Sequence, residues 1–295
     1  MFGLYFGNYL LEKNKISQSQ LKDVMKQHSN SRVKLGLIAI SEKLMTAKQA
    51  EEINQLQKQL DKRFGDIAIE KGYLIAEEVT HLLNLQGNPY LQFVQSLIDL
   101  QIMTFAEIEQ CLEAFKKEYH LSDTDLEAIK TGDIDSIIPV FADVNAPFIG
   151  DIISLSIRNI VRFIHHQIII KKSYKSSEYE FTNIAFQELY GDHKLFVGLA
   201  SKKDELLAIA EPYAKETFPR MEVDAFDSVC EFINCTNGLY ASSVSMEDIN
   251  LELVPPQFYG NQNRKVYGNF TIVPFFLTGN QVDLIVAHNN DVKID

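Results

Sequence analysis

The stretch DSVCEFINCTNGLY, residues Asp227–Tyr240, has the pattern of an amphipathic helix. With the preceding residue, its apolar positions recur at helical spacing and predict a buried stripe of Phe226, Val229, Cys230 and Ile233. The opposite side carries Asp227, Glu231, Asn234 and Gly238. At about 100° per residue, these four positions lie within roughly 60° of one another. One helix face therefore presents two acids, an amide and finally a position with no side chain.

The composition is that of an ordinary globular protein and leaves room for two domains. The chain has 295 residues, of which 46% are apolar and 23% are charged. The net charge of −12 is unevenly placed, with −1 over residues 1–118 and −11 over residues 119–295. An acidic C-terminal half argues against nucleic acid and anionic membranes as partners.

The cysteines indicate neither a disulfide framework nor a metal site. Cys111, Cys230 and Cys235 are few and scattered, and no nearby histidine completes a metal-ligand pattern. The first residues lack the pattern of a signal peptide, and no apolar run approaches the roughly 18 residues of a membrane span. We therefore predict a cytoplasmic protein with reduced cysteines and without a metal of its own.

The first 118 residues contain a repeat with a period of 29. Four similar segments begin at Phe6, Leu35, Phe64 and Phe93. Gly7, Gly36 and Gly65 align in this register, and Thr46 and Thr104 are suited to cap helices. Each copy reads as a short helix, a turn near positions 14, 43 and 72, and a longer helix. A single helix pair cannot bury its apolar face alone, so the copies should stack into an all-α domain over residues 1–118.

This repeat resembles the N-terminal domain of type II secretion and pilus-assembly ATPases, the MshE-type cyclic di-GMP-binding domain. In that family, tandem Arg-Leu-Gly turns and terminal glutamines hold the dinucleotide. The matching positions here are Lys34, Gly36, Gln57, Arg63, Gly65 and Gln86.

The match to this family departs from its pattern in the basic and turn positions. Lys34 replaces an arginine and Lys43 replaces the turn glycine, whereas Arg63 and Gly72 keep the family residues. A lysine does not reproduce the flat stacking and forked donation of arginine. Cyclic di-GMP is thus one expected ligand, and a purely structural or protein-docking helical module is the alternative.

Residues 119–146 read as a structured connector, because acidic cap residues alternate with apolar ones and Gly and Ser are sparse. From Pro147 the pattern changes to α+β, which predicts a second domain over residues 147–295. Its expected helices are 147–167, 203–218 and the segment around 227–240, and its expected strands are 194–200, 249–260, 264–277 and 281–288.

This order and the helix face resemble the CheC/CheX/FliY group of chemotaxis phosphatases, and the CheX arrangement most closely. The family signature is an Asp or Ser, then Glu four residues later, Asn three residues after that, and a downstream Pro. Here it reads Asp227, Glu231, Asn234 and Pro255-Pro256. The resemblance implies an α/β sandwich-type domain with an antiparallel sheet, helices on one face and a homodimer.

The resemblance also implies a reaction, the hydrolysis of the aspartyl phosphate of a CheY-like response regulator. The receiver supplies Mg²⁺ and a lysine, so this chain needs no cofactor of its own. Asn234 is expected to position the attacking water, and Glu231 to pair with the receiver lysine. Gly238 would allow close backbone approach, and Asp227 would tune the helix N-terminal end. A non-enzymatic receiver-binding adaptor and a cyclic di-GMP-responsive effector are the alternatives, and the same face is also compatible with an ordinary solvated surface.

Overall fold

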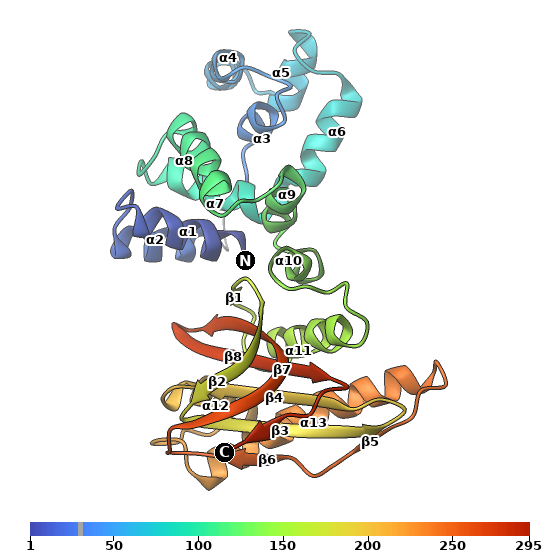
Figure 1. Cartoon of the computed structure of the whole chain (residues 1–295). Coiled ribbons are helices and arrows are strands. Elements are labelled where there is room, and N and C mark those ends of the chain that lie inside the picture. The colour runs from blue at the N-terminus through green and yellow to red at the C-terminus, as the bar shows by residue number, and fades with distance from the viewer. Residues whose placement is uncertain (29–31) are drawn as a thin grey trace. The chain divides into compact units, whose positions relative to one another are not determined.

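A computed structural model describes residues 1–28 and 32–295 of the chain (Figure 1). The chain divides into two compact units, Met1–Asp133 and Ile134–Asp295. The segment 119–146, predicted as a connector, contains one helix of the first unit and one helix of the second.

The first unit is entirely helical in its described residues, which confirms the predicted all-α class. Its helices are α1 (Phe2–Glu12), α2 (Gln18–His28), α3 (Leu35–Ser41), α4 (Ala47–Gln57), α5 (Phe64–Glu70), α6 (Ala76–Asn84), α7 (Pro89–Asp99), α8 (Phe105–Glu118) and α9 (Asp123–Thr131), with a short 3₁₀ turn η1 (Leu85–Gly87). Their starts are fixed by local hydrogen bonds. Thr46 and Thr104, for example, each form a capping box with the residue three positions later.

Four turns of the first unit share one backbone conformation. Asn14, Lys43, Gly72 and Gln101 have φ angles of 53°, 59°, 69° and 56°. Each residue follows the first helix of a pair, and the positions are 29 residues apart. A left-handed residue ends a helix and reverses the chain, at a cost that only glycine escapes.

The paired helices of the first unit approach closely at glycines. A Cβ atom on Gly7 would lie 2.6 Å from Leu21, and one on Gly65 would lie 2.8 Å from Val79. The unit is also filled by a cluster of aromatic rings from α1, α7 and α8. In it, Phe6 lies edge-on to Phe93 and Phe115 at centroid distances of 6.4 Å and 5.8 Å.

The second unit contains helices and strands, as predicted. Its helices are α10 (Ile134–Phe141), α11 (Ile149–Phe163), the 3₁₀ turn η2 (Asp204–Leu206), α12 (Leu207–Ala214) and α13 (Val223–Ser245). Its strands are β1 (Ile168–Ile170), β2 (Tyr174–Phe181), β3 (Asn183–Gly191), β4 (Leu195–Ser201), β5 (Leu251–Leu253), β6 (Gln257–Tyr259), β7 (Arg264–Leu277), β8 (Asn280–His288) and β9 (Lys293–Ile294).

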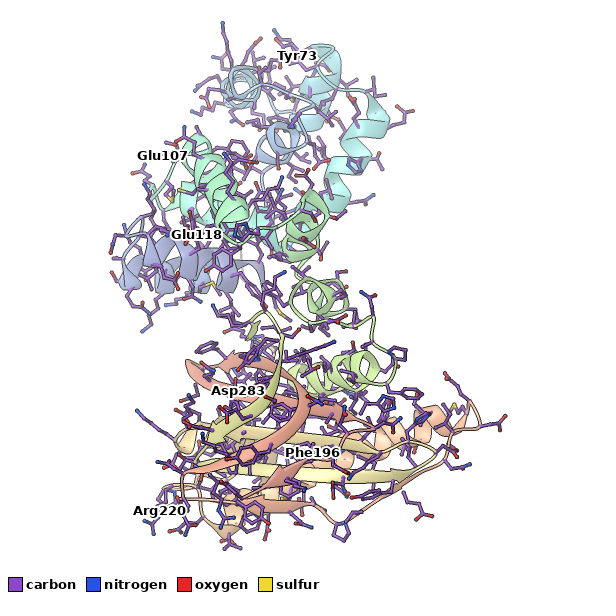
Figure 2. The ribbon with its side chains drawn as sticks, viewed as in Figure 1. Tyr73, Glu107, Glu118, Phe196, Arg220 and Asp283 are labelled. Atoms are coloured by element: carbon purple, nitrogen blue, oxygen red, sulfur yellow. The ribbon has the colours of Figure 1, made fainter. Side chains whose placement is uncertain are left out.

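The described strands form one antiparallel sheet with the central order β7-β8-β4-β3. β2 pairs with β7 at one end, and β5 and β6 pair with β3 at the other. α11 and α13 pack against one face of the sheet, which confirms the predicted architecture. The other face holds an apolar cluster that includes Phe186, Phe196 and Phe270, and Figure 2 labels Phe196 within the sheet.

One buried carboxylate lies in this sheet. Asp283 on β8 is 3% exposed and accepts hydrogen bonds from the hydroxyl of Tyr179 and from the amide of Gln281 (Figure 2). Burial, followed by the Asp283 charge, raises the pKa of Tyr179 far above its usual range. This pair therefore ties β2 to β8 with the tyrosine protonated. Among the described residues, no helix is both long enough and apolar enough to cross a bilayer.

Candidate functional site

The four residues predicted to share a helix face lie on α13, a helix of 23 residues. Asp227, Glu231 and Asn234 are exposed, and Gly238 is half-buried. A Cβ atom on Gly238 would meet nothing within 4 Å, so the space above it is open. The opposite side of α13 buries Phe226, Val229, Cys230, Phe232 and Ile233. The helix therefore presents the four candidates on a single solvent-facing ridge.

The ridge carries acids and an amide, and the cysteine beneath it is unsuited to nucleophilic chemistry. Burial, with a smaller contribution from Asp227, raises the pKa of Cys230 to about 12. A thiol with such a pKa is almost entirely protonated near neutral pH, and the thiolate is the reactive form. Among the described residues, no group of three or more His, Cys, Asp or Glu side chains is placed to hold a metal ion.

The amide of Asn234 is held from below by a residue that the sequence analysis did not identify. Gln187 on β3 is 1% exposed, and its Nε2 donates to Asn234 Oδ1 at 2.7 Å. The same Nε2 donates to the backbone oxygen of Val254 at 2.8 Å. A glutamine directly after the apolar residues Ile184, Ala185 and Phe186 was the available sequence signal, but nothing in it pointed to a helix 47 residues away.

A second buried amide completes this network. Asn237 is fully buried, and its Nδ2 donates to Gln187 Oε1 at 2.9 Å. Its own Oδ1 has no hydrogen-bond partner. Asn237 was not among the site residues predicted from the sequence. Buried amides in a low-dielectric interior bind one another strongly, so Asn237 and Gln187 hold each other in place.

The downstream prolines of the signature lie beside this network. Pro255 and Pro256 separate β5 from β6, both of which pair with β3. Residues 254–256 lie opposite only two residues of β3, so the edge is locally bulged. Prolines are tolerated on such an edge because they have no N–H to offer a neighbouring strand. The bulge places the Val254 oxygen against Gln187.

The six positions matched to a nucleotide-binding motif all lie in the first unit, where several bind groups of the protein itself. Lys34 Nζ lies 2.7 Å from a carboxylate oxygen of Asp99. Gln86 donates to the Val33 oxygen at 2.8 Å, and Gln57 donates to the Lys62 oxygen at 3.2 Å. Arg63 is exposed at the start of α5.

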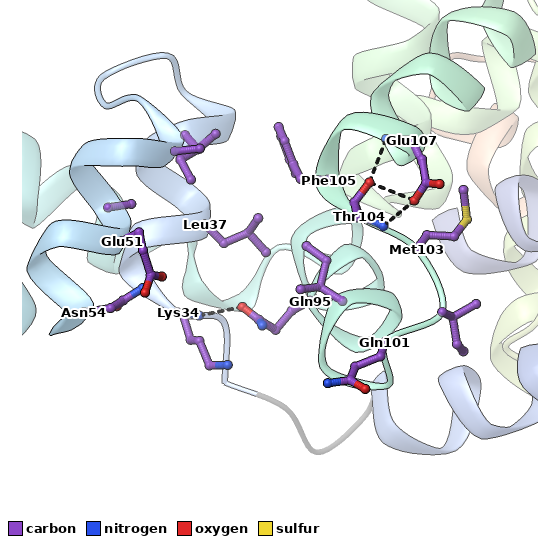
Figure 3. Close-up of a pocket in the computed structure, with 16 residues that line it drawn as sticks. Lys34, Leu37, Glu51, Asn54, Gln95, Gln101, Met103, Thr104, Phe105 and Glu107 are labelled. Atoms are coloured by element: carbon purple, nitrogen blue, oxygen red, sulfur yellow. Dashed lines mark hydrogen bonds between the residues drawn. The ribbon is translucent and has the colours of Figure 1, made fainter. Parts of the chain in front are cut away.

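The structure brings only two of these six residues to one cavity. Lys34 and Gly36 line a cavity of about 530 Å³, together with residues of α4, α7 and α8 (Figure 3). Its buried polar member is Gln95, whose Oε1 accepts from the Lys34 backbone N–H, as the dashed line in Figure 3 shows. Gln57, Arg63, Gly65 and Gln86 do not line this cavity.

The second unit is thus an α+β domain that presents an acidic ridge with one immobilised amide. Residues 183–276 match the family model described as "Chemotaxis phosphatase CheX". This segment contains β3, α13 and the proline bulge, which together form the candidate site. The second unit is CheX-like.

Several solved structures are similar to this unit. A CheC-like superfamily protein from Shewanella sp. PV-4 is 14% identical, with a TM-score of 0.44, and the match covers 49% of this chain and 98% of that one. The chemotaxis protein CheX from Desulfovibrio desulfuricans is 12% identical, with a TM-score of 0.42, covering 50% and 99%. The CheX–CheY–BeF₃–Mg²⁺ complex from Borrelia burgdorferi is 15% identical, with a TM-score of 0.40, and the match covers 48% of this chain and 97% of that one. No curated protein sequence matches the chain.

Proposed function

We propose that the second unit hydrolyses the aspartyl phosphate of a CheY-like response regulator. The observation that carries this proposal is that Glu231 and Asn234 are exposed on one ridge while Gln187 holds the Asn234 amide from within. An immobilised amide beside a carboxylate is suited to completing an active site on another protein. The match of residues 183–276 to the CheX family supports the same reaction.

The chemistry assigned to this ridge is positioning rather than bond-making. The water oxygen forms a bond to phosphorus, the bond from phosphorus to the aspartyl oxygen breaks, and inorganic phosphate leaves. The receiver supplies Mg²⁺ and a lysine, which neutralise the developing charge. Asn234 holds the water in line, and an amide can do so without carrying a charge. Glu231 pairs with the receiver lysine, one turn earlier on the ridge.

The remaining ridge residues shape the contact with the receiver. Gly238 leaves open space one turn beyond Asn234, so the partner backbone can approach the helix closely. α13 begins at Val223, so Asp227 lies in its second turn and the acid of the first turn is Asp224. Asp227 therefore adds a second carboxylate to the ridge, one turn before Glu231, rather than interacting with the helix N-terminus. A receiver partner would place the protein in the cytoplasm.

The test is the rate at which a phosphorylated receiver loses phosphate, with Mg²⁺ present. Asn234→Ala should lower the acceleration by about 100-fold, as expected when a reactant is misplaced. Ser243→Ala, an exposed change on the same helix but away from the ridge, is the control and should leave the rate unchanged. Wild-type activity of N234A would refute the mechanism. Receiver binding without faster phosphate loss would instead make the protein a non-enzymatic adaptor.

We also propose that the second unit forms a homodimer through a sheet edge. β2 pairs only with β7, and β5 and β6 pair only with β3, among the described strands. Each edge therefore offers backbone groups to a second copy. Light scattering on the full chain should give twice the monomer mass, and a monomer at all concentrations would contradict the proposal.

A cyclic di-GMP-binding role for the first unit is a second candidate. The observation that favours it is a pair of reciprocal hydrogen bonds between the second and third copies of the repeat. Gln57 binds the carbonyl that precedes Arg63, and Gln86 binds the carbonyl that precedes Lys34. This reciprocal arrangement suits a ligand with two equivalent halves. Titration calorimetry with cyclic di-GMP should show binding that Arg63→Ala abolishes, and the absence of heat at high micromolar ligand would exclude it.

A further inference from the structure

The orientation of the Asn234 amide can be traced to a single backbone atom. The oxygen of Val254 is a carbonyl and can only accept a hydrogen bond. The end of the Gln187 side chain that lies 2.8 Å from it must therefore be the NH₂ group. That NH₂ group is also the one that meets Asn234, at 2.7 Å, so Asn234 must face it with its oxygen.

The other end of Gln187 is fixed in the same way. With its NH₂ group committed, its Oε1 faces Asn237 and accepts from the Asn237 NH₂ group at 2.9 Å. Rotating any one of these amides by 180° would bring two donors or two acceptors together. Gln187 and Asn237 are 1% and 0% exposed, so water cannot relieve such a mismatch.

We propose that Gln187 is a positioning residue, which holds Asn234 with its oxygen turned inward and its NH₂ group turned toward the partner. The inference rests on the proposed function, because it names the chemical group that the ridge offers to the receiver. That group is a hydrogen-bond donor. It binds the oxygen of the attacking water or an oxygen of the phosphoryl group. The proton of the water then passes to an oxygen of the phosphate or of the receiver, and Asn234 takes no proton.

The Val254 oxygen is itself rigidly held. The N–H of Val254 donates to the Glu188 oxygen at 3.1 Å, so both backbone polar groups of Val254 are bound to β3 or its side chains. The following Pro255 disfavours the helical region for Val254 and keeps it extended. The bulge at residues 254–256 thus fixes the position of the Val254 oxygen, which determines the orientation of the Gln187 side chain and, through it, that of Asn234 and Asn237. The downstream proline of the signature acquires a physical role in this way.

The strand β3 offers a matched control for this role. Asn183 is also a buried amide on β3, but both of its hydrogen bonds are to the backbone: it donates to the Lys203 oxygen and accepts from the Asn261 N–H. No hydrogen bond joins it to Asn234. Gln187→Leu and Asn183→Leu should both lower the unfolding temperature of the full chain. Only the loss at Gln187 should affect the chemistry.

The expected result is a separation of kcat from receiver affinity. Gln187→Leu should lower kcat for receiver dephosphorylation by about tenfold, less than removing the amide altogether, with the dissociation constant for the receiver unchanged. Asn183→Leu should keep the wild-type kcat per folded molecule. Asn234→Asp, which keeps an inward acceptor but turns an oxygen outward, should be as slow as N234A. A wild-type kcat in Q187L, or an equal loss in both leucine variants, would overturn the proposal.

A spectroscopic measurement tests the orientation without any receiver. In the full chain labelled with ¹⁵N and ¹³C, a scalar coupling across the hydrogen bond should join Gln187 Nε2 to the Asn234 side-chain carbonyl carbon. A folded chain that lacks this coupling contradicts the assigned polarity. If the coupling is present and N234A is fully active, the proposed function fails while the polarity of the amide stands. The two failures are therefore distinguishable.

Discussion

The candidate residues of the two units differ in what surrounds them. On α13, the exposed Asn234 is held by a buried glutamine that the fold places behind it, with Glu231 beside it on the same ridge. In the first unit, Lys34 faces the Asp99 carboxylate and Gln86 closes on a backbone carbonyl. The side chains of the ridge are exposed to solvent, whereas Lys34, Gln57 and Gln86 bind groups of their own unit.

The difference shows that residues matching a motif support a function only when the structure leaves their chemical groups able to bind a partner. Matching residue types are necessary for a site, but the supporting contacts decide whether a group is free to act. A lysine paired with a carboxylate has part of its charge compensated, so it attracts an anionic ligand less strongly. An amide pinned through one atom keeps its other atoms for a partner.

The largest effect is expected on receiver binding when the charge of one ridge residue is reversed. Glu231→Lys should weaken receiver binding by at least about tenfold, because a charge-assisted contact becomes repulsion. At saturating receiver, kcat should change little. Binding measured by fluorescence anisotropy provides the test, with Glu247→Lys as the control for net charge. Equal losses in both variants would show that only the overall charge matters.

The repeat turns of the first unit offer a test of stability. Lys43 has a left-handed φ of 59° where Gly72, one copy later, has 69°. Lys43→Gly should raise the free energy of unfolding by about 0.5–1 kcal/mol, and Gly72→Ala should lower it by about 1 kcal/mol. No atom lies within 4 Å of a Cβ on Gly72, so this change reports the backbone alone. Urea unfolding would measure both, and a shift of the same sign in the two variants would contradict the expectation.

Removing the Asp99 carboxylate tests whether its ion pair with Lys34 competes with a ligand of the first unit. If the first unit binds cyclic di-GMP, Asp99→Asn should tighten binding about threefold, since exposed ion pairs contribute less than about 1 kcal/mol. The amide retains the possibility of bonding to Gln95, so the fold should persist. Glu70→Gln, which changes a different exposed pair, with Lys62, is the control. Weaker binding in D99N would show that the pair orients the lysine rather than competing with the ligand.

The smallest expected effect is a pH dependence in the second unit. Burial, and then the charge of His193, lowers the pKa of His288, and Phe148 lies 4.8 Å from its ring. The unfolded chain therefore binds a proton more readily, so the contribution to stability is complete above about pH 6.5 and is lost as pH falls through the lowered value. His288→Asn should reduce the fall in melting temperature between pH 7 and pH 5 by about 2 °C. An identical pH profile in H288N would exclude this histidine as a source.

The sequence predicts the ridge well because its information is local. The positions of Asp227, Glu231 and Asn234 follow from helical periodicity within one segment, and all three are exposed on α13 as that periodicity requires. The two classes of unit follow in the same way, since the repeat is helical throughout and the later segment alternates apolar strands with helices. The turn positions near 14, 43 and 72 are set by local backbone conformation as well.

The parts that the sequence does not predict depend on contacts between distant segments. Gln187 reaches Asn234 only because β3 lies beneath α13, and the Val254 oxygen joins them only because an edge strand bulges at its prolines. The strands β1, β2 and β3 were also missed. Most residues of β2 are polar and face outward along the sheet edge, so they give no apolar strand pattern. In the first unit, sequence matching grouped six residues that the fold divides between one cavity and other places.

The hydrogen-bonded amides of Gln187, Asn234 and Asn237 constrain which substitutions this domain can accept during evolution. Three side chains from two segments share a single pattern of donors and acceptors, anchored on a main-chain oxygen that mutation cannot alter. A replacement at Gln187 that offers no donor to this oxygen would leave it unsatisfied, whatever residues stand at 234 and 237. A donor at position 187 should therefore be retained over time, and changes at 234 and 237 should keep the groups that face it.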